Sequence, residues 1–139
     1  MKILVSQCLL GIECRFDGKS CKNQKVIDYV KGHTIIAVCP EMNGGLPCPR
    51  IPGERVGDKI TGKDGSDLTP EYTAGALHAL QMAKENNVDL CILKSRSPSC
   101  GKGMIHDGTF TGTMVEGNGV TCELLTKNGF KVIADTELE

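Results

Sequence analysis

The sequence predicts an α/β fold, in which a parallel sheet of about four strands carries helices on both faces. Short apolar runs alternate along the chain with segments of helical periodicity, and this order favours right-handed crossovers between parallel strands. Three of the apolar runs end in polar turns that carry a cysteine, as expected where strands finish at a ligand-binding edge. Since 139 residues correspond to about one domain, we expect a single three-layer, Rossmann-like domain over residues 1–139.

The first part of the chain predicts a strand, a helix and a second strand. The apolar run within residues 2–6 predicts the first strand. Apolar residues at helical spacing predict a helix over residues 23–31, and Gly32 is its expected stop. Residues 34–38 form the second apolar run and predict the next strand. Together these elements make one strand-helix-strand unit of a parallel sheet.

Residues 39–67 are rich in glycine and proline. We expect an irregular loop there, without a helix, apart from a small hairpin over residues 55–61 around Gly57. A loop of this length in a compact domain is usually functional or mobile.

The second half of the chain continues the alternation. Thr69 is a good helix N-cap and Pro70 suits the first helical position, so we expect a helix to about residue 86. Its expected packing face consists of Ala76, Leu77, Leu80 and Ala83 or Lys84. The remaining elements are a strand over residues 88–94, a polar excursion over 101–112, a helix over 119–127 capped by Asn118, and a last strand over 130–134.

Composition and charge limit the function classes. The 16 basic and 17 acidic residues nearly cancel and only 4% of residues are aromatic, which argues against nucleic acid as a partner. No stretch approaches the roughly 20 apolar residues of a membrane span, and the run from Met1 to Val5 is too short for a signal-peptide core. We therefore expect a cytoplasmic protein without membrane contact, and the sequence specifies no oligomeric state.

The eight cysteines indicate metal, cluster or catalytic chemistry rather than disulfides, because the expected compartment keeps thiols reduced. They show no repeated C-x-x-C pair, so a structural zinc site of the usual spacing is disfavoured. Cys91 lies within a strand and Cys122 within a helix, and for both we expect core packing. Cys14 and Cys21 lie in a polar loop, either as a redox pair or without a shared role.

Cys8, Cys39 and Cys100 each follow the end of a predicted strand. If these strands are parallel neighbours about 4.8 Å apart, their loops bring the three thiols to one centre. The set is then either three buried thiols or the protein ligands of an iron-sulfur cluster, in which one iron stays open to bind substrate as a Lewis acid. Cys48, between two prolines, is a rival for the position of Cys39.

Polar residues near these cysteines have two interpretations each. Glu41 follows Cys39 by two residues and is either a general acid or base or a solvated loop carboxylate. Ser97 and Ser99 precede Cys100, and their hydroxyls either bind substrate or stabilise the turn.

The charged residues nearby carry weaker hypotheses. Lys94 and Arg96 supply positive charge suited to an anionic cluster or a phosphate. His106 and Asp107 are adjacent in sequence, but without a pocket around them we favour a non-catalytic role.

Five motifs, in order along nearly the whole chain, resemble those of the thiouracil desulfidase family, long catalogued as a domain of unknown function. They are Ser6 to Gly11, Cys39 to Glu41, Gly44 to Arg50, Ser97 to Gly101 and Asp107 to Phe110.

The resemblance implies a 4Fe-4S cluster on Cys8, Cys39 and Cys100, with Glu41 and Ser97 as catalytic residues. It also implies non-redox removal of sulfur from a small thiolated substrate, such as a thiouracil or a thiolated nucleoside or nucleotide, with release of sulfide. Cys48 stands where many relatives have threonine, and it stays the rival ligand.

A second function class remains open from the sequence alone. An iron-sulfur or metal carrier, or a redox sensor, also binds through thiols but catalyses nothing. Turnover distinguishes the two, because a carrier loses its iron to an acceptor whereas an enzyme keeps it through many reactions.

Overall fold

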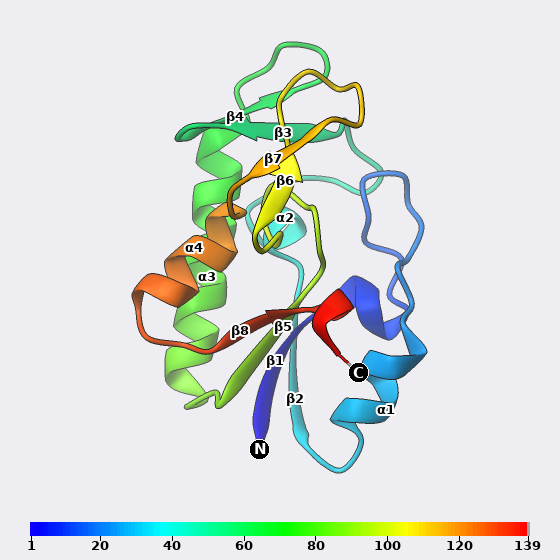
Figure 1. Cartoon of the computed structure of the whole chain (residues 1–139), viewed down its shortest axis with the longest axis vertical. Helices are drawn as coiled ribbons and strands as arrows, with labels where there is room; N and C mark the ends of the chain where they lie inside the picture. The colour runs from blue at the N-terminus through cyan, green and yellow to red at the C-terminus, as the bar shows by residue number, and fades with distance from the viewer. Residues whose placement is uncertain (139) are drawn as a thin grey trace.

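The computed structural model describes residues 1–138 and contains the expected parallel sheet (Figure 1). Its four strands are β1 (Lys2–Ser6), β2 (Thr34–Val38), β5 (Leu90–Leu93) and β8 (Val132–Ala134). They lie in the order β2-β1-β5-β8 and every neighbouring pair is parallel. The α/β prediction is therefore confirmed, and β1 lies between the two strands that precede the other cysteine loops.

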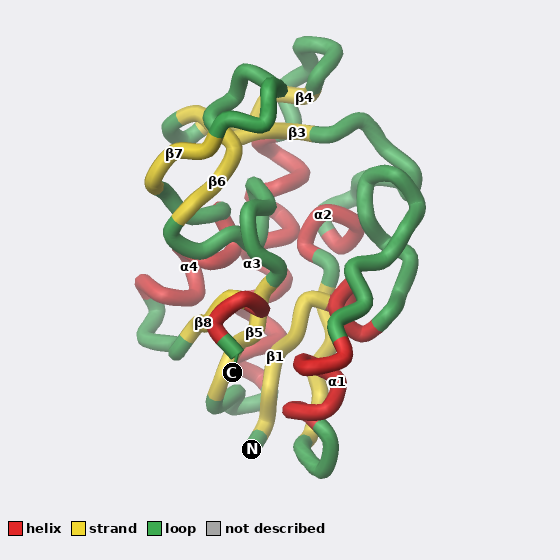
Figure 2. Tube along the Cα trace, turned by 45° about the vertical axis from the view of Figure 1, so that its right-hand side comes forward, coloured by secondary structure: helices red, strands yellow, loops and turns green. Residues whose placement is uncertain are grey.

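Helices cover both faces of the sheet (Figures 1 and 2). On one face α3 (Thr69–Glu85) packs against α4 (Val120–Lys127). On the other face lie α1 (Gln24–Val30) and the short 3₁₀ helix η1 (Gln7–Leu10). Within residues 1–138 no helix is both long and apolar enough to cross a membrane.

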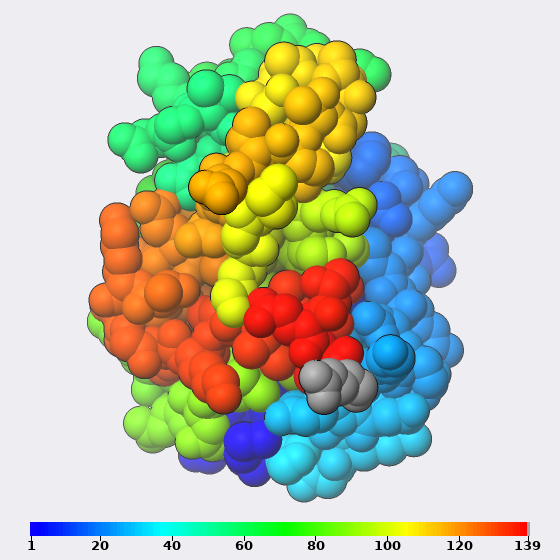
Figure 3. Space-filling view, in the orientation of Figure 1, coloured from blue at the N-terminus to red at the C-terminus, as the bar shows by residue number. Residues whose placement is uncertain are grey.

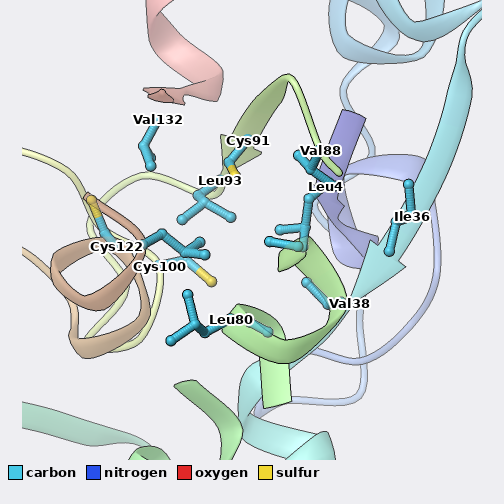
Figure 4. Packing of buried hydrophobic residues seen from close by; sticks show 13 residues of the cluster. Leu4, Ile36, Val38, Leu80, Val88, Cys91, Leu93, Cys100, Cys122 and Val132 are labelled. Carbon is cyan, nitrogen blue, oxygen red and sulfur yellow. The ribbon is translucent and has the colours of Figure 1, made fainter. Parts of the chain in front are cut away.

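Strand β1 contributes side chains to two separate apolar clusters, one on each face of the sheet, because neighbouring residues of a strand point to opposite sides. Leu4 packs toward α3 and α4, whereas Ile3 and Val5 pack toward α1. Cys91 and Cys122 are buried in the first cluster, as expected for core thiols (Figure 4).

The expected packing face of α3 is wrong at one position. Leu77 is 54% exposed, although its neighbours Ala76 and Leu80 are buried. The face of α3 that packs against the sheet and α4 is narrower than the apolar face expected from the sequence. The side chain of Leu77 lies outside this buried face and is therefore exposed to solvent.

Two antiparallel hairpins stand beyond the carboxyl edge of the sheet (Figure 1). The first, β3 (Gly53–Val56) with β4 (Lys59–Gly62), agrees with the expected hairpin. The second, β6 (Met104–His106) with β7 (Met114–Glu116), includes part of the segment expected to be a polar excursion. Strands of three residues are too short for a recognisable alternation.

The expectation that residues 39–67 lack a helix is wrong, because α2 (Pro40–Asn43) forms one helical turn there. Pro40 occupies its first turn, where a missing N–H costs nothing. The side chain of Asn43 accepts a hydrogen bond from the Cys39 amide at 3.0 Å. A helix of one turn has no periodicity for a sequence to reveal.

Two expected caps are also wrong. Leu68, not Thr69, is the N-cap of α3, and the Thr69 hydroxyl instead accepts a bond from the Ile60 amide at 2.9 Å. Gly119 is the N-cap of α4, and Asn118 accepts a bond from the Gly103 amide at 2.8 Å. In both places a tertiary contact uses the side chain that was expected to cap.

The short helix α2 touches α3 through glycine. A methyl group added at Gly75 would meet the carbonyl group of Pro40, and one added at Gly44 would meet that of Glu71. This close approach fixes α2, and with it Glu41, against the long helix.

We expect Gly75→Ala to lower the free energy of unfolding by about 1 to 3 kcal/mol, because overpacking against backbone outweighs the better helix propensity of alanine. Urea unfolding measures the change. Thr73→Ala, at an exposed position of the same helix, is the control and should stay within about 0.5 kcal/mol. A stabilised Gly75→Ala protein would contradict the tight contact.

Candidate functional site

The carboxyl edge of the sheet opens on a cavity of about 490 Å³. Cys8 lies in η1 after β1, Cys39 follows β2, and Cys100 lies in the loop after β5. All three residues line the cavity. The parallel order of these strands thus brings together the three thiols that the sequence placed at strand ends.

Two of these thiols have raised pKa values and stay protonated. Cys100 is 4% exposed, and burial raises its pKa to about 12. A hydrogen bond with Cys14, followed by burial, raises the pKa of Cys39 far above its ordinary value. Binding of a metal or cluster here therefore releases protons. Figure 4 shows Cys100 within the apolar cluster that also contains Leu93 and Leu80.

Cys14 is a fourth thiol at this centre, which sequence reasoning did not assign to it. Its side chain is buried and contacts both Cys39 and Cys8. The bond with Cys39 favours its thiolate, but the bond with Cys8 and burial together raise the pKa of Cys14 to about 11. Cys21 also lines the cavity. The only signal in the sequence was the proximity of Cys14 to Cys8.

Cys48 does not line the cavity and instead contacts a neighbouring loop. Its Sγ donates to the carbonyl oxygens of Glu13 and Arg15, both at 3.3 Å, and it is not among the residues that line the cavity. Its contacts tie the loop that carries Cys14 to the loop after α2.

The thiols around the cavity fit an iron-sulfur cluster better than a single ion. Among residues 1–138 no three histidine, cysteine or carboxylate side chains are arranged to hold one metal ion. The cavity is nevertheless lined by five cysteines, and thiolates are the ligands of iron-sulfur clusters. A cubane cluster is wider than one ion, so its ligands stand further apart.

Glu41 is a fixed carboxylate in the cavity wall. Its Oε1 accepts bonds from Arg50 Nε and the Tyr72 hydroxyl, each at 3.0 Å. Its Oε2 accepts bonds from the hydroxyls of Ser99 at 3.1 Å and Ser97 at 3.4 Å. The side chain is 15% exposed, which excludes a solvated loop carboxylate.

Arg50 and Tyr72 were missed as site residues. Burial works against the charge of Arg50, but the adjacent Glu41 carboxylate more than offsets it and raises the pKa of the guanidinium. Burial, with the charge of Glu41, also raises the pKa of Tyr72 well above its usual range. Both residues therefore stay protonated donors to Glu41. Tyr72 comes from α3, and no local pattern pairs it with a residue in α2.

The two serines serve the turn as well as the cavity. Ser97 Oγ accepts bonds from the amides of Ser99 and Cys100 at 3.1 and 3.2 Å. Ser99 Oγ lies 2.9 Å from Ser97 Oγ and 3.5 Å from Cys100 Sγ. Both serines line the cavity. The turn-stabilising interpretation is thus confirmed by the hydrogen bonds, and substrate binding stays a prediction.

The cavity also contains positive charge without a carboxylate partner. Lys63, Lys94 and Arg96 line it, and in the part of the chain that the structure describes none of them forms a salt bridge. His106 lines the cavity too, whereas Asp107 is not part of its lining and accepts bonds from the amide and hydroxyl of Thr109. Of these two neighbours, only His106 is thus part of the cavity wall.

Comparisons with known proteins show similarity along nearly the whole chain. A family model described as 2-thiouracil desulfurase matches residues 3–137. YbbK of Bacillus subtilis (strain 168), described as an uncharacterized protein, is 42% identical over 146 residues, which cover 98% of this chain and 97% of YbbK. The solved structure of the 4Fe-4S-dependent thiouracil desulfidase TudS (DUF523Vcz) is 40% identical and covers 99% of this chain and 92% of its own, with a TM-score of 0.93.

Proposed function

The chain belongs to the 2-thiouracil desulfurase family, and from that membership we propose that residues 1–139 work as one 4Fe-4S-dependent desulfidase domain that cleaves a carbon-sulfur bond and releases sulfide. The resemblance carried by its motifs is confirmed by the family model. The similarity to TudS supports both the cluster and the enzymatic activity.

One observation carries the proposal: three strand ends deliver three thiols to a cavity that also contains a fixed carboxylate. We assign Cys8, Cys39 and Cys100 as the cluster ligands. Cys48 is the weaker choice, because its thiol binds the carbonyls of a neighbouring loop.

The chemistry is a hydrolysis without net oxidation. Water forms a bond from its oxygen to the sulfur-bearing carbon, the carbon-sulfur bond breaks, and sulfur leaves as sulfide. The bound cluster supplies an iron without a protein ligand, which acts as a Lewis acid toward sulfur. Glu41 accepts the proton of the water and returns it to the leaving group. Ser97, which contacts Glu41, orients the substrate.

The substrate class extends to thiolated pyrimidine nucleosides and nucleotides. A bare thiouracil has no phosphate, yet Lys63, Lys94 and Arg96 leave unpaired positive charge in the cavity. Such charge favours a phosphate-bearing substrate. The contribution of these cationic side chains to phosphate binding should decrease as the salt concentration rises, because salt screens their charge.

The test is a sulfide-release screen with anaerobically reconstituted protein, using 2-thiouracil, its nucleoside and its monophosphate. We expect about four irons per chain and many sulfides per chain, with the highest kcat/KM for the monophosphate at low salt. Release of no more than one sulfide per chain, with transfer of iron to an acceptor protein, would instead establish the carrier class. Equal kcat/KM for all three substrates would remove the phosphate preference.

A further inference from the structure

The loop from residue 107 to 113, between β6 and β7, brings an aromatic side chain to the cavity. Phe110 and Gly112 line the cavity from this loop, as does His106 at its start. Figure 3 shows the segment on the surface, in yellow to orange, beside the β3–β4 hairpin in green. The loop lies outside the parallel sheet and is thus separate from the strand ends that carry the cysteines.

Phe110 has an unfavourable backbone conformation. Within residues 1–138 three residues other than glycine have positive φ: Asn87, Arg96 and Phe110. Asn87 lies just beyond α3, where asparagine often takes this conformation. Phe110, with φ of +58°, is a bulky residue for which the left-handed region is an outlier. Such strain persists only where the surroundings impose it, and it concentrates at ligand sites.

Glu54 imposes this conformation. It lies on β3 and is only 8% exposed. Its Oε1 accepts bonds from the amides of Gly108 at 2.9 Å and Phe110 at 3.1 Å. A buried carboxylate that accepts two backbone amides of one loop fixes the direction in which the loop presents its side chains.

Aromatic residues are scarce in this chain, with three phenylalanines, two tyrosines and no tryptophan. Two of the phenylalanines, Phe16 and Phe110, line the cavity, whereas Phe130 packs against the core. A phenyl ring held at a cavity offers a planar face on which a pyrimidine ring can stack, as aromatic side chains do in nucleic-acid sites.

We propose that Phe110 is a specificity-determining residue that stacks on the ring of the substrate, and that Glu54 is the positioning residue that holds it there. The inference rests on the proposed function, because it identifies the part of the thiolated substrate that this wall recognises. The stacking contact itself involves neither the cluster nor cleavage of the carbon-sulfur bond, so its effect on binding can be measured separately from sulfide release.

The test compares Phe110→Leu, Phe110→Tyr and the control Phe130→Leu in cluster-loaded protein. The probes are 2-thiouracil, the ring-free thiocarbonyl compound thiourea, and uracil, which has no sulfur. We expect Phe110→Leu to raise the KM for 2-thiouracil and the Kd for uracil by about 5- to 150-fold, the range for loss of one base-stacking contact. The kcat for 2-thiouracil and the KM for thiourea should stay near the parent values. Phe110→Tyr and Phe130→Leu should retain parent binding.

Glu54→Ala should raise the same KM and Kd while the ring is still present, and Glu54→Gln, which keeps one acceptor oxygen, should restore most of the binding. Unchanged uracil binding in Phe110→Leu, no uracil binding by the parent, or an equal loss for thiourea would each overturn the stacking role. Calorimetric binding of uracil also separates the two hypotheses. If the parent releases no sulfide but its uracil binding depends on Phe110, the proposed function fails while the stacking role stands.

Discussion

Cys100→Ala is expected to lose both the brown iron-sulfur chromophore and all sulfide release. Cys100 is buried in the loop after β5 and is one of three thiols that the loops after separate strands bring to the cavity. With one of the three removed, two proposed ligands remain, and these hold a cubane cluster poorly. Loss of the open iron removes the Lewis acid, so activity should fall below detection rather than decline by a moderate factor.

The measurement is iron per chain and visible absorption after anaerobic reconstitution, with sulfide release from the same samples. Cys39→Ala should behave like Cys100→Ala, whereas Cys48→Ala should keep about four irons. Cys122→Ala is the matched control, because this thiol is equally buried but lies in the core outside the cavity. A full cluster in Cys39→Ala together with its loss in Cys48→Ala would reassign the third ligand.

Glu41→Gln is expected to keep the cluster and bind substrate, yet to release sulfide roughly 100- to 10,000-fold more slowly, the usual contribution of general acid-base catalysis. Glutamine has the shape of glutamate and fits between Arg50 and Ser99, but it cannot carry a proton at neutral pH. The defect should therefore appear in kcat.

Initial rates at saturating 2-thiouracil measure this effect, and absorption confirms the cluster in each sample. Glu85→Gln, on the exposed end of α3, is the control and should keep the parent rate. If cluster-loaded Glu41→Gln also works at the parent rate, Glu41 has no role in proton transfer, and Ser97 becomes the next residue to substitute.

The four strands of the parallel sheet could be predicted because each apolar run is long enough to show its pattern and ends abruptly in a polar turn, whereas their order in the sheet could not. The cysteines in these turns, Cys8, Cys39 and Cys100, could be predicted to lie near one another, since parallel strands share one carboxyl edge. The short helix α2 and the strands β6 and β7 escaped prediction because three or four residues have no measurable period.

The partners of Glu41 are a different case. The apolar pattern around Tyr72 predicts only a helix, yet its hydroxyl reaches a carboxylate 31 residues earlier in the chain. From the sequence, Cys14 was either half of a redox pair with Cys21 or a loop thiol without a shared role, whereas in the folded chain its side chain contacts Cys39. Contacts between distant segments depend on packing angles, and a single sequence does not encode these as local patterns.

The two sides of the cavity differ in how well they tolerate substitutions. The side formed by the strand ends belongs to the core of the sheet, where a new side chain disturbs packing. The side formed by the β6–β7 hairpin lies at the surface, and such loops accept insertions and new side chains without cost to the core. Engineering toward bulkier thiolated rings should therefore randomise residues 109–113 and leave the strand ends untouched, so that substrate range changes while the chemistry is retained.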